Sequence, residues 1–284
     1  MAPVQRLRVG RKTPRRLGME VSALARLVEV DWVAQQLGQP GIVIVDPRRP
    51  MKYLSGHLPD ALNVPVYKTF GADGKLLTPD ALAEFLGAAG LGGDATPVLY
   101  DSPEGQNAAM LAWILEYLGR TDVCVMASFF EAWKAAGREV RYKPVQVPPR
   151  SFASQPNPSG RITVEEARAA GRLKFVDFRS REEFSGERSI GDDQPGHIPG
   201  AVNIVWRELA NPPQALLKPR AEIERILAAA GLQRGDQIVA YCRSGPRAAL
   251  GYLVLREAGY EARLFDGSWA EWSRLGLPAE NSAR

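Results

Sequence analysis

The sequence has few of the residues that mark disulfide-stabilised folds or metal sites. Its 284 residues include only two cysteines and two histidines. Two cysteines cannot form a disulfide framework, and a chain of this length can bury a sizeable core without one. The two histidines lie 140 positions apart with no cysteine ligands near them, which argues against a metal site. We therefore expect a reducing cytoplasmic location and a function without metal or cofactor.

Long hydrophobic runs are also absent from the sequence. No apolar stretch reaches the ~18 residues that a membrane-spanning helix needs, so we expect no membrane role. Hydrophobic residues make up 45% and charged residues 24% of the chain, and these values are typical of a folded globular protein rather than a disordered or fibrous one. At about one to two hundred residues per domain, the length predicts two domains.

The net charge of +4 does not come from the body of the chain. Six basic residues and no acidic residue lie in the first 18 positions, whereas from Met19 onward 30 basic residues are balanced by 32 acidic ones. The body therefore offers no basic face for nucleic acid. The first segment is Arg-rich like a mitochondrial transit peptide, but Pro3, Gly10 and Pro14 disfavour a helix there. A flexible basic extension at residues 1–20, or a true start at Met19, is the favoured interpretation.

The chain contains one internal repeat. In both halves an apolar run ends in Asp-x-Arg and is followed by a Gly-His motif, at residues 56–61 and 196–201. The matching positions are Asp46, Arg48, His57 and Asp101 in the first half, and Asp177, Arg179, His197 and Cys242 in the second. The spacing between the halves grows by nine residues, which places an insertion around residues 185–194. The duplication predicts two domains of the same fold.

Each half predicts alternating helices and strands. In the second half we expect strands at 174–178, 237–242 and 261–266, and helices at 221–231, 247–259 and 269–275. Strands that alternate with helices indicate an α/β fold with a mainly parallel sheet flanked by helices on both faces. We expect domains at 21–141 and 161–277, a proline-rich linker wrapped across the surface at 142–160, and a tail at 278–284.

Cys242 lies where a predicted strand leads into a predicted helix. The next positions hold Arg243, Ser244 and Gly245, and Arg247 follows at the start of the helix. This edge of a parallel sheet is where ligands bind. A turn of backbone N–H groups, a helix N-terminus and two guanidinium groups would favour the thiolate and attract an anionic donor. We therefore predict Cys242 as a nucleophile and Arg243, Ser244, Gly245 and Arg247 as substrate-binding residues.

The motifs just described resemble those of the tandem-domain rhodaneses, the thiosulfate sulfurtransferases. The resemblance rests on Cys-x4-Arg after a strand, Asp-x-Arg before Gly-His-Ile-Pro-Gly-Ala, and the duplication, and it covers residues 21–277. It implies two rhodanese-like domains and a persulfide on Cys242 that carries the outer sulfur of thiosulfate to cyanide, a thiol or an acceptor protein. It also implies a catalytically inactive first domain, because Asp101 replaces the cysteine there and a carboxylate cannot carry sulfane sulfur. We expect a monomer.

The turn separates this function from related ones. Phosphatases that resemble this family have five residues between Cys and Arg, so the four found here favour sulfur over phosphate. Mercaptopyruvate enzymes of the family typically have Gly at the position of Arg243, which favours thiosulfate. A mercaptopyruvate-type enzyme and a non-catalytic sulfur-carrier or redox-sensing module are the alternatives. Some relatives have a substrate-binding Arg at the position of Glu183, so either Arg247 takes over that contact or thiosulfate binds weakly.

The remaining candidate residues have structural interpretations beside the functional ones. His197 is interpreted as structural, because its motif recurs in the half that lacks the cysteine. Asp177 and Arg179 are expected to fix the loop after a strand through charge-assisted hydrogen bonds, and they are candidates for the border of the site. Trp206 is either a pocket wall or a core contact. Cys124 lies in an apolar run and is interpreted as structural.

Overall fold

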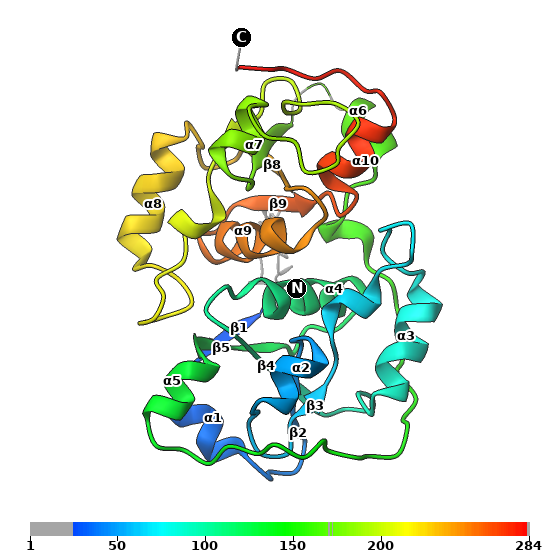
Figure 1. Cartoon of the computed structure of the whole chain (residues 1–284), viewed down its shortest axis with the longest axis vertical. Coiled ribbons are helices and arrows are strands. Elements are labelled where there is room, and N and C mark those ends of the chain that lie inside the picture. The colour runs from blue at the N-terminus through cyan, green and yellow to red at the C-terminus, as the bar shows by residue number, and fades with distance from the viewer. Residues whose placement is uncertain (1–24, 170, 172, 283–284) are drawn as a thin grey trace, which may run out of the picture.

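The computed structural model describes residues 25–282 apart from 170 and 172. The extension expected at residues 1–20 lies outside the described residues. Two parallel sheets, each flanked by helices, form the two halves of the molecule (Figure 1), which confirms the α/β class and the pair of similar domains. No helix in the described part combines the length and the apolar character that crossing a bilayer requires.

The first domain is built on a five-stranded sheet with the strand order β1-β5-β4-β2-β3, in which all neighbouring strands are parallel. Parallel pairing requires crossover connections, and here helices and longer loops supply them. The elements are β1 (Arg26–Val28), α1 (Val30–Gln36), β2 (Ile42–Asp46), α2 (Pro50–Leu54), β3 (Leu62–Asn63), η1 (Val66–Thr69), α3 (Pro79–Ala88), β4 (Thr96–Asp101), α4 (Gln106–Tyr117), β5 (Cys124–Phe129) and α5 (Phe130–Ala135).

The second domain repeats this arrangement on a four-stranded parallel sheet with the order β7-β6-β8-β9. Its described strands and helices overlap the ranges that the sequence predicts. The elements are η2 (Pro158–Gly160), α6 (Val164–Ala169), β6 (Lys174–Asp177), α7 (Arg181–Ser185), β7 (Val202–Asn203), η3 (Trp206–Glu208), α8 (Arg220–Ala229), β8 (Gln237–Tyr241), α9 (Pro246–Glu257), β9 (Glu261–Leu264) and α10 (Ser268–Arg274).

The segment between the domains contains no helix or strand from residue 142 to 157. It runs along the first domain and is hydrogen-bonded to it at several points. The N–H of Val145 donates to the hydroxyl of Tyr53 at 2.9 Å, and the N–H of Arg150 donates to the carbonyl of Gly87 at 2.9 Å. Proline has no backbone N–H, so the prolines of this segment reduce the number of donors that need hydrogen-bond partners. A few hydrogen bonds hold the segment to the first domain.

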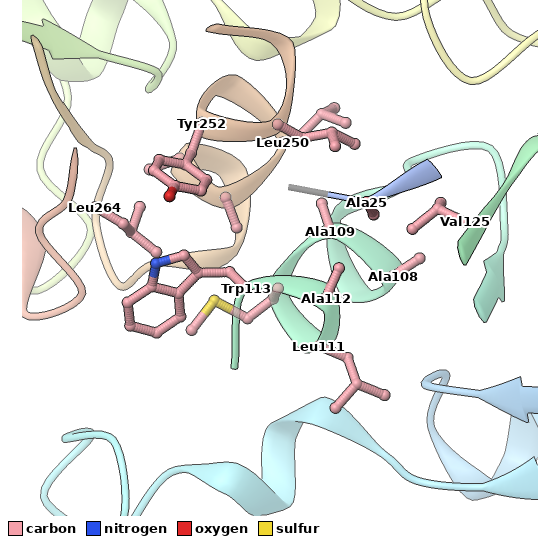
Figure 2. Packing of buried hydrophobic residues seen from close by; sticks show 14 of the residues in the cluster. Ala25, Ala108, Ala109, Leu111, Ala112, Trp113, Val125, Leu250, Tyr252 and Leu264 are labelled. Carbon is pink, nitrogen blue, oxygen red and sulfur yellow. The ribbon is translucent and has the colours of Figure 1, made fainter. Parts of the chain in front are cut away.

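Helices α4 and α9 join the two domains. They lie side by side at the centre of the molecule (Figure 1), and the largest buried apolar cluster of the described residues includes both. Figure 2 shows Ala109, Ala112 and Trp113 of α4 close to Leu250 and Tyr252 of α9. Small side chains on α4 let the helices approach closely, and the large rings fill the space beside them. The domains therefore share one apolar core.

Gly251 lets α9 pack closely against the residue that follows β6. A Cβ built at Gly251 would lie 2.3 Å from the ring of Phe178, which is fully buried. Phe178 directly follows β6 and stands between Asp177 and Arg179. The ring of Phe178 occupies the space that a side chain at position 251 would need, so the helix and the ring are matched in shape at this point.

The change Gly251→Ala should therefore lower the free energy of unfolding by ~1–3 kcal/mol, because the helix and the ring must move apart. Equilibrium unfolding in urea measures this loss. Phe178→Leu removes the ring atoms that the new methyl group would meet, so the double variant should lose less than the sum of the two single losses. Strict additivity would show that the helix and the ring do not meet here.

Candidate functional site

Cys242 lies directly after β8, in the short turn that leads into α9. The residue is buried, with 1% of its surface exposed, and the backbone N–H of Gly245 donates to its Sγ at 3.1 Å. Gly245 has a φ of +106°, a backbone conformation that favours glycine. A Cβ built there would lie 3.4 Å from Cε of Met110 on α4. The turn therefore directs an N–H at the sulfur, and the first domain packs against it.

The backbone of Cys242 is held by the start of α10. Its N–H donates to Oγ of Ser268 at 3.2 Å, and its carbonyl accepts from the N–H of Trp269 at 3.0 Å. Ser268 is fully buried with a φ of +53°, a conformation that side chains rarely adopt, and its hydroxyl donates to the carbonyl of Phe265. These contacts fix the main chain of Cys242. Sequence reasoning missed Ser268, which is 26 positions away and carries no local signal.

Arg247 is hydrogen-bonded to a carboxylate. Its Nη1 and Nη2 donate to the two oxygens of Glu183 at 2.6 and 2.9 Å, and Glu183 is 3% exposed. Glu183 also forms a capping box with Ser180 at the start of α7. Burial acts to raise the pKa of Glu183, but the hydrogen bonds and charge of Arg247 hold it below its ordinary value. Burial acts to lower the pKa of Arg247, but Glu183 and the nearby Cys242 raise it. The guanidinium predicted to bind substrate is thus already ion-paired.

Arg243 faces a second carboxylate. Its Nε lies 3.0 Å from Oδ1 of Asp192, whose side chain is 3% exposed, whereas the side chain of Arg243 is 31% exposed. The carbonyl of Arg243 accepts from the N–H of Ala270 at 3.0 Å. The next residue of the turn, Ser244, is exposed. Asp192 was not singled out from the sequence, and the signal that could have found it is the insertion at residues 185–194 in which it lies.

Asp177 and Arg179 form a buried ion pair beside this turn. Asp177 ends β6, the neighbour of β8 in the sheet, and its Oδ2 accepts from Nη2 of Arg179 at 2.6 Å. The same nitrogen donates to the carbonyl of Gly196 at 2.7 Å, and the guanidinium lies over the ring of Trp269 at 4.8 Å. The pair therefore ties the Gly-His loop to the strand end. It reaches Cys242 indirectly, through Trp269.

Trp206 belongs to the apolar core. It lies in η3, is 5% exposed, and is part of the same buried cluster as Cys242 and Phe178. Its backbone N–H donates to the carbonyl of Phe178 at 3.4 Å, and the guanidinium of Arg207 lies over its ring. Of the two interpretations left open by the sequence, these contacts favour the core contact.

The backbone of each histidine is hydrogen-bonded to the segment that follows its domain. The backbone of His57 pairs with Arg141 in an antiparallel bridge, and that of His197 pairs with Glu280 in the same way. Each ring stacks on an aromatic ring, with centroid separations of 3.9 and 3.6 Å. The same contacts occur in both domains, although only the second has a cysteine at the strand-to-helix turn, which supports the structural interpretation.

In the first domain, the turn that corresponds to that of Cys242 is filled by a carboxylate. Asp101 ends β4, is 2% exposed, and accepts from the backbone N–H groups of Ser102, Asn107 and Ala108 at 2.8, 2.7 and 3.0 Å. The amide of Asn107, at the second position of α4, donates to it as well. A turn of N–H donors that could bind an anion is thus occupied by a side chain of the chain itself.

Burial raises the pKa of Asp101 from 3.8 to about 6, because the N–H donors only partly offset the loss of water. The folded protein therefore binds this proton more tightly than the unfolded chain does. The resulting stabilisation is complete below about pH 3.8 and is lost as the pH rises through about 6. Asp101→Asn removes this titration. The free energy of unfolding of the variant, relative to the wild type, should rise by ~2–3 kcal/mol from about pH 4 to pH 7 in urea unfolding experiments.

Asp122→Asn provides a control of opposite sign. A hydrogen bond from Arg120 holds the pKa of Asp122 below its ordinary value, so this carboxylate stabilises the fold at higher pH and loses that effect in acid. The free energy of unfolding of Asp122→Asn, relative to the wild type, should fall as the pH rises, and most of this change should occur below about pH 5. A difference between Asp101→Asn and the wild type that does not vary with pH would contradict the assignment.

The comparisons with known proteins agree on one family. The family model of the rhodanese-like domain matches residues 29–136 and 163–275. A thiosulfate sulfurtransferase of Corynebacterium glutamicum is 32% identical over 274 residues, which cover 88% of each chain. The sulfur carrier protein TtuD of Thermus thermophilus is 29% identical over 282 residues, covering 89% of this chain and 95% of the relative.

A solved structure is similar over most of the chain. The crystal structure of SseA from Escherichia coli, described in terms of the fold and catalytic mechanism of 3-mercaptopyruvate sulfotransferases, aligns with a TM-score of 0.78 and 25% identity. The alignment covers 86% of this chain and 99% of that one. Both halves of the molecule therefore have counterparts in these relatives.

Proposed function

The chain belongs to the rhodanese-like domain family of sulfurtransferases, and from this membership we propose that it moves the sulfane sulfur of thiosulfate through Cys242 to cyanide or another thiophilic acceptor. The observation that carries the proposal is the sulfur of Cys242 in the turn between β8 and α9, where the N–H of Gly245 donates to it. The similarity to a relative named thiosulfate sulfurtransferase supports this donor.

Two displacements at sulfur make up the proposed reaction. The Cys242 thiolate attacks the outer sulfur of thiosulfate, a new S–S bond forms, and the bond between the two thiosulfate sulfurs breaks. Sulfite leaves with the electron pair, and Cys242 becomes a persulfide anion. Cyanide then attacks the terminal sulfur, the persulfide S–S bond breaks, and thiocyanate leaves while the thiolate is restored. Splitting the transfer in two lets donor and acceptor use the site in turn.

The protein contributes position and electrostatics to these steps. The N–H of Gly245 donates to Sγ of Cys242, the atom on which negative charge is restored when the acceptor removes the outer sulfur. The contacts of Ser268 and Trp269 hold the backbone of the nucleophile, so the sulfur keeps its place between the two displacements. Burial of Cys242 limits contact with water and with competing thiols, which favours survival of the persulfide.

A second candidate function is that of a sulfur carrier, in which the Cys242 persulfide is passed to an acceptor protein rather than to cyanide. It is favoured by the similarity to the relative named a sulfur carrier protein. The chemistry at Cys242 is the same in both cases, and only the acceptor differs. Mercaptopyruvate is the corresponding alternative donor, suggested by the similarity to SseA.

Incubation with thiosulfate followed by intact mass measurement tests the proposal. We expect the wild-type protein to gain one sulfur atom and to lose it on addition of cyanide, with thiocyanate as the product. Cys242→Ser should gain no sulfur, because a hydroxyl cannot hold it. Cys124→Ala is the matched control: this second cysteine is buried in the core around β5, so its loss should cost ~1–2 kcal/mol of stability while sulfur loading continues.

Two results would overturn the proposal. If neither thiosulfate, mercaptopyruvate nor a small organic persulfide adds a sulfur atom to the wild-type protein, the chain is not a sulfurtransferase. If Cys242→Ser still loads sulfur and Cys124→Ala does not, the nucleophile is the other cysteine. Loading by mercaptopyruvate alone would keep the transfer chemistry and replace the donor.

A further inference from the structure

Both arginines of the Cys242 turn face carboxylates that are almost fully buried. Arg247 is held by two hydrogen bonds to Glu183, and Arg243 lies 3.0 Å from Asp192. These four side chains together carry no net charge. The positive field expected from the two arginines is therefore compensated within the protein before any donor arrives.

Carboxylates at these positions are present only in the second domain, which has Cys242. In the first domain the position corresponding to Glu183 is Lys52, which is exposed on α2, and the second residue of α4 is Asn107, where α9 has Arg247. Asp192 lies in the segment at residues 185–194 that the first domain lacks. Scaffold residues such as the Asp-x-Arg pair occur in both domains, whereas these charge pairs accompany the nucleophile. This distribution points to a role in the reaction rather than in the fold.

Thiosulfate is a dianion, and its sulfonate would have to compete with Glu183 for Arg247. The pair is bidentate, so both Nη atoms already donate to carboxylate oxygens that are themselves shielded from water. Because each arginine is already paired with a carboxylate, the site attracts each further negative charge on a donor only weakly. A donor with fewer negative charges binds with a smaller free-energy penalty, because a site without net charge attracts a second negative charge only weakly.

We propose that Glu183 and Asp192 determine donor specificity by limiting the negative charge that the Cys242 site accepts. This inference rests on the sulfur transfer proposed above. The favoured donors are sulfane-sulfur compounds with a single negative charge or none, such as an organic thiosulfonate, R–SO2–S−, or the persulfide of a thiol. With a thiosulfonate, Cys242 takes the outer sulfur, the S–S bond of the donor breaks, and a sulfinate leaves in place of sulfite.

Methanethiosulfonate and thiosulfate are a matched pair of probes. They share the sulfane sulfur and the sulfonyl group, and they differ in that a methyl group replaces one charged oxygen. We expect the wild-type enzyme to have the higher kcat/KM for methanethiosulfonate. Glu183→Gln keeps an oxygen that can cap α7 but removes the charge, so it should shift the ratio of the two kcat/KM values towards thiosulfate by about five- to tenfold. Asp192→Asn, on a different segment, should shift it in the same direction.

Glu182→Gln is the control variant. Glu182 is the neighbouring residue on α7, is exposed, and carries the same charge outside the site. The ratio of the two kcat/KM values should stay within about twofold of the wild type, because water and salt screen an exposed charge.

A second readout does not depend on sulfur transfer. Iodoacetate and iodoacetamide alkylate a thiolate by the same displacement of iodide, but only iodoacetate is charged. In a Cys124→Ala background, where Cys242 is the sole cysteine, Glu183→Gln should raise the ratio of the iodoacetate rate to the iodoacetamide rate by about fivefold. Glu182→Gln should leave that ratio unchanged.

The two readouts separate failure of this inference from failure of the proposed function. If no sulfur donor loads Cys242 but the alkylation ratio rises, the control of charge at the site is correct and the sulfur-transfer assignment is wrong. If sulfur loads but neither ratio changes in Glu183→Gln or Asp192→Asn, the carboxylates are structural and the specificity assignment is overturned. Equal acceleration of both members of each probe pair would overturn it as well, because access rather than charge would then have changed.

Discussion

In each domain a buried Asp-x-Arg ion pair stands at the end of one strand of the sheet. The neighbouring strand leads to Asp101 in the first domain and to Cys242 in the second. Arg179 reaches three parts of the second domain at once: the carboxylate at the end of β6, the carbonyl of Gly196, and the ring of Trp269. The backbone N–H of Trp269 in turn holds the carbonyl of Cys242. A buried charge is tolerated only when it is fully paired, so this arginine cannot shift without a large loss of stability. The position of the nucleophile depends on that constraint.

The first domain has the same network without the nucleophile. Arg48 bonds Asp46 and the carbonyl of Gly56, and its guanidinium lies over the ring of Phe130, which corresponds in position to Trp269. The network therefore belongs to the fold and not to the chemistry. What differs is the turn itself, where the carboxylate of Asp101 takes the N–H donors that would face a ligand. In the second domain the N–H of Gly245 faces a sulfur, whereas in the first domain three backbone N–H groups face a carboxylate.

Much of this architecture could be predicted from the sequence, because it depends on local or repeated patterns. The duplicated motifs imply two similar domains, and the alternation of strands and helices implies parallel sheets. Cys242, Gly245 and Arg247 stand at a strand-to-helix turn that is visible in a few consecutive residues. The role of Trp206 could not be decided, since a tryptophan in a loop can face a core or a pocket equally well.

The contacts that could not be predicted are pairings between distant segments. Arg247 and Glu183 are 64 positions apart, and no spacing rule joins them. Glu183 is recognisable from sequence as a helix-capping residue after Ser180, yet capping does not reveal what its second oxygen contacts. Asp192 lies within an insertion, for which the first domain gives no template. The position of the arginines could therefore be predicted from the sequence, but the carboxylates that face them could not.

Met110 connects the first domain to the turn of Cys242. It belongs to α4 of the first domain, and it lies against the turn that carries Gly245. A change of volume at this thioether would press on the catalytic turn from outside its own domain. The proposed sulfur transfer therefore depends on both domains, because α4 of the first domain packs against the turn of the second domain that holds Cys242.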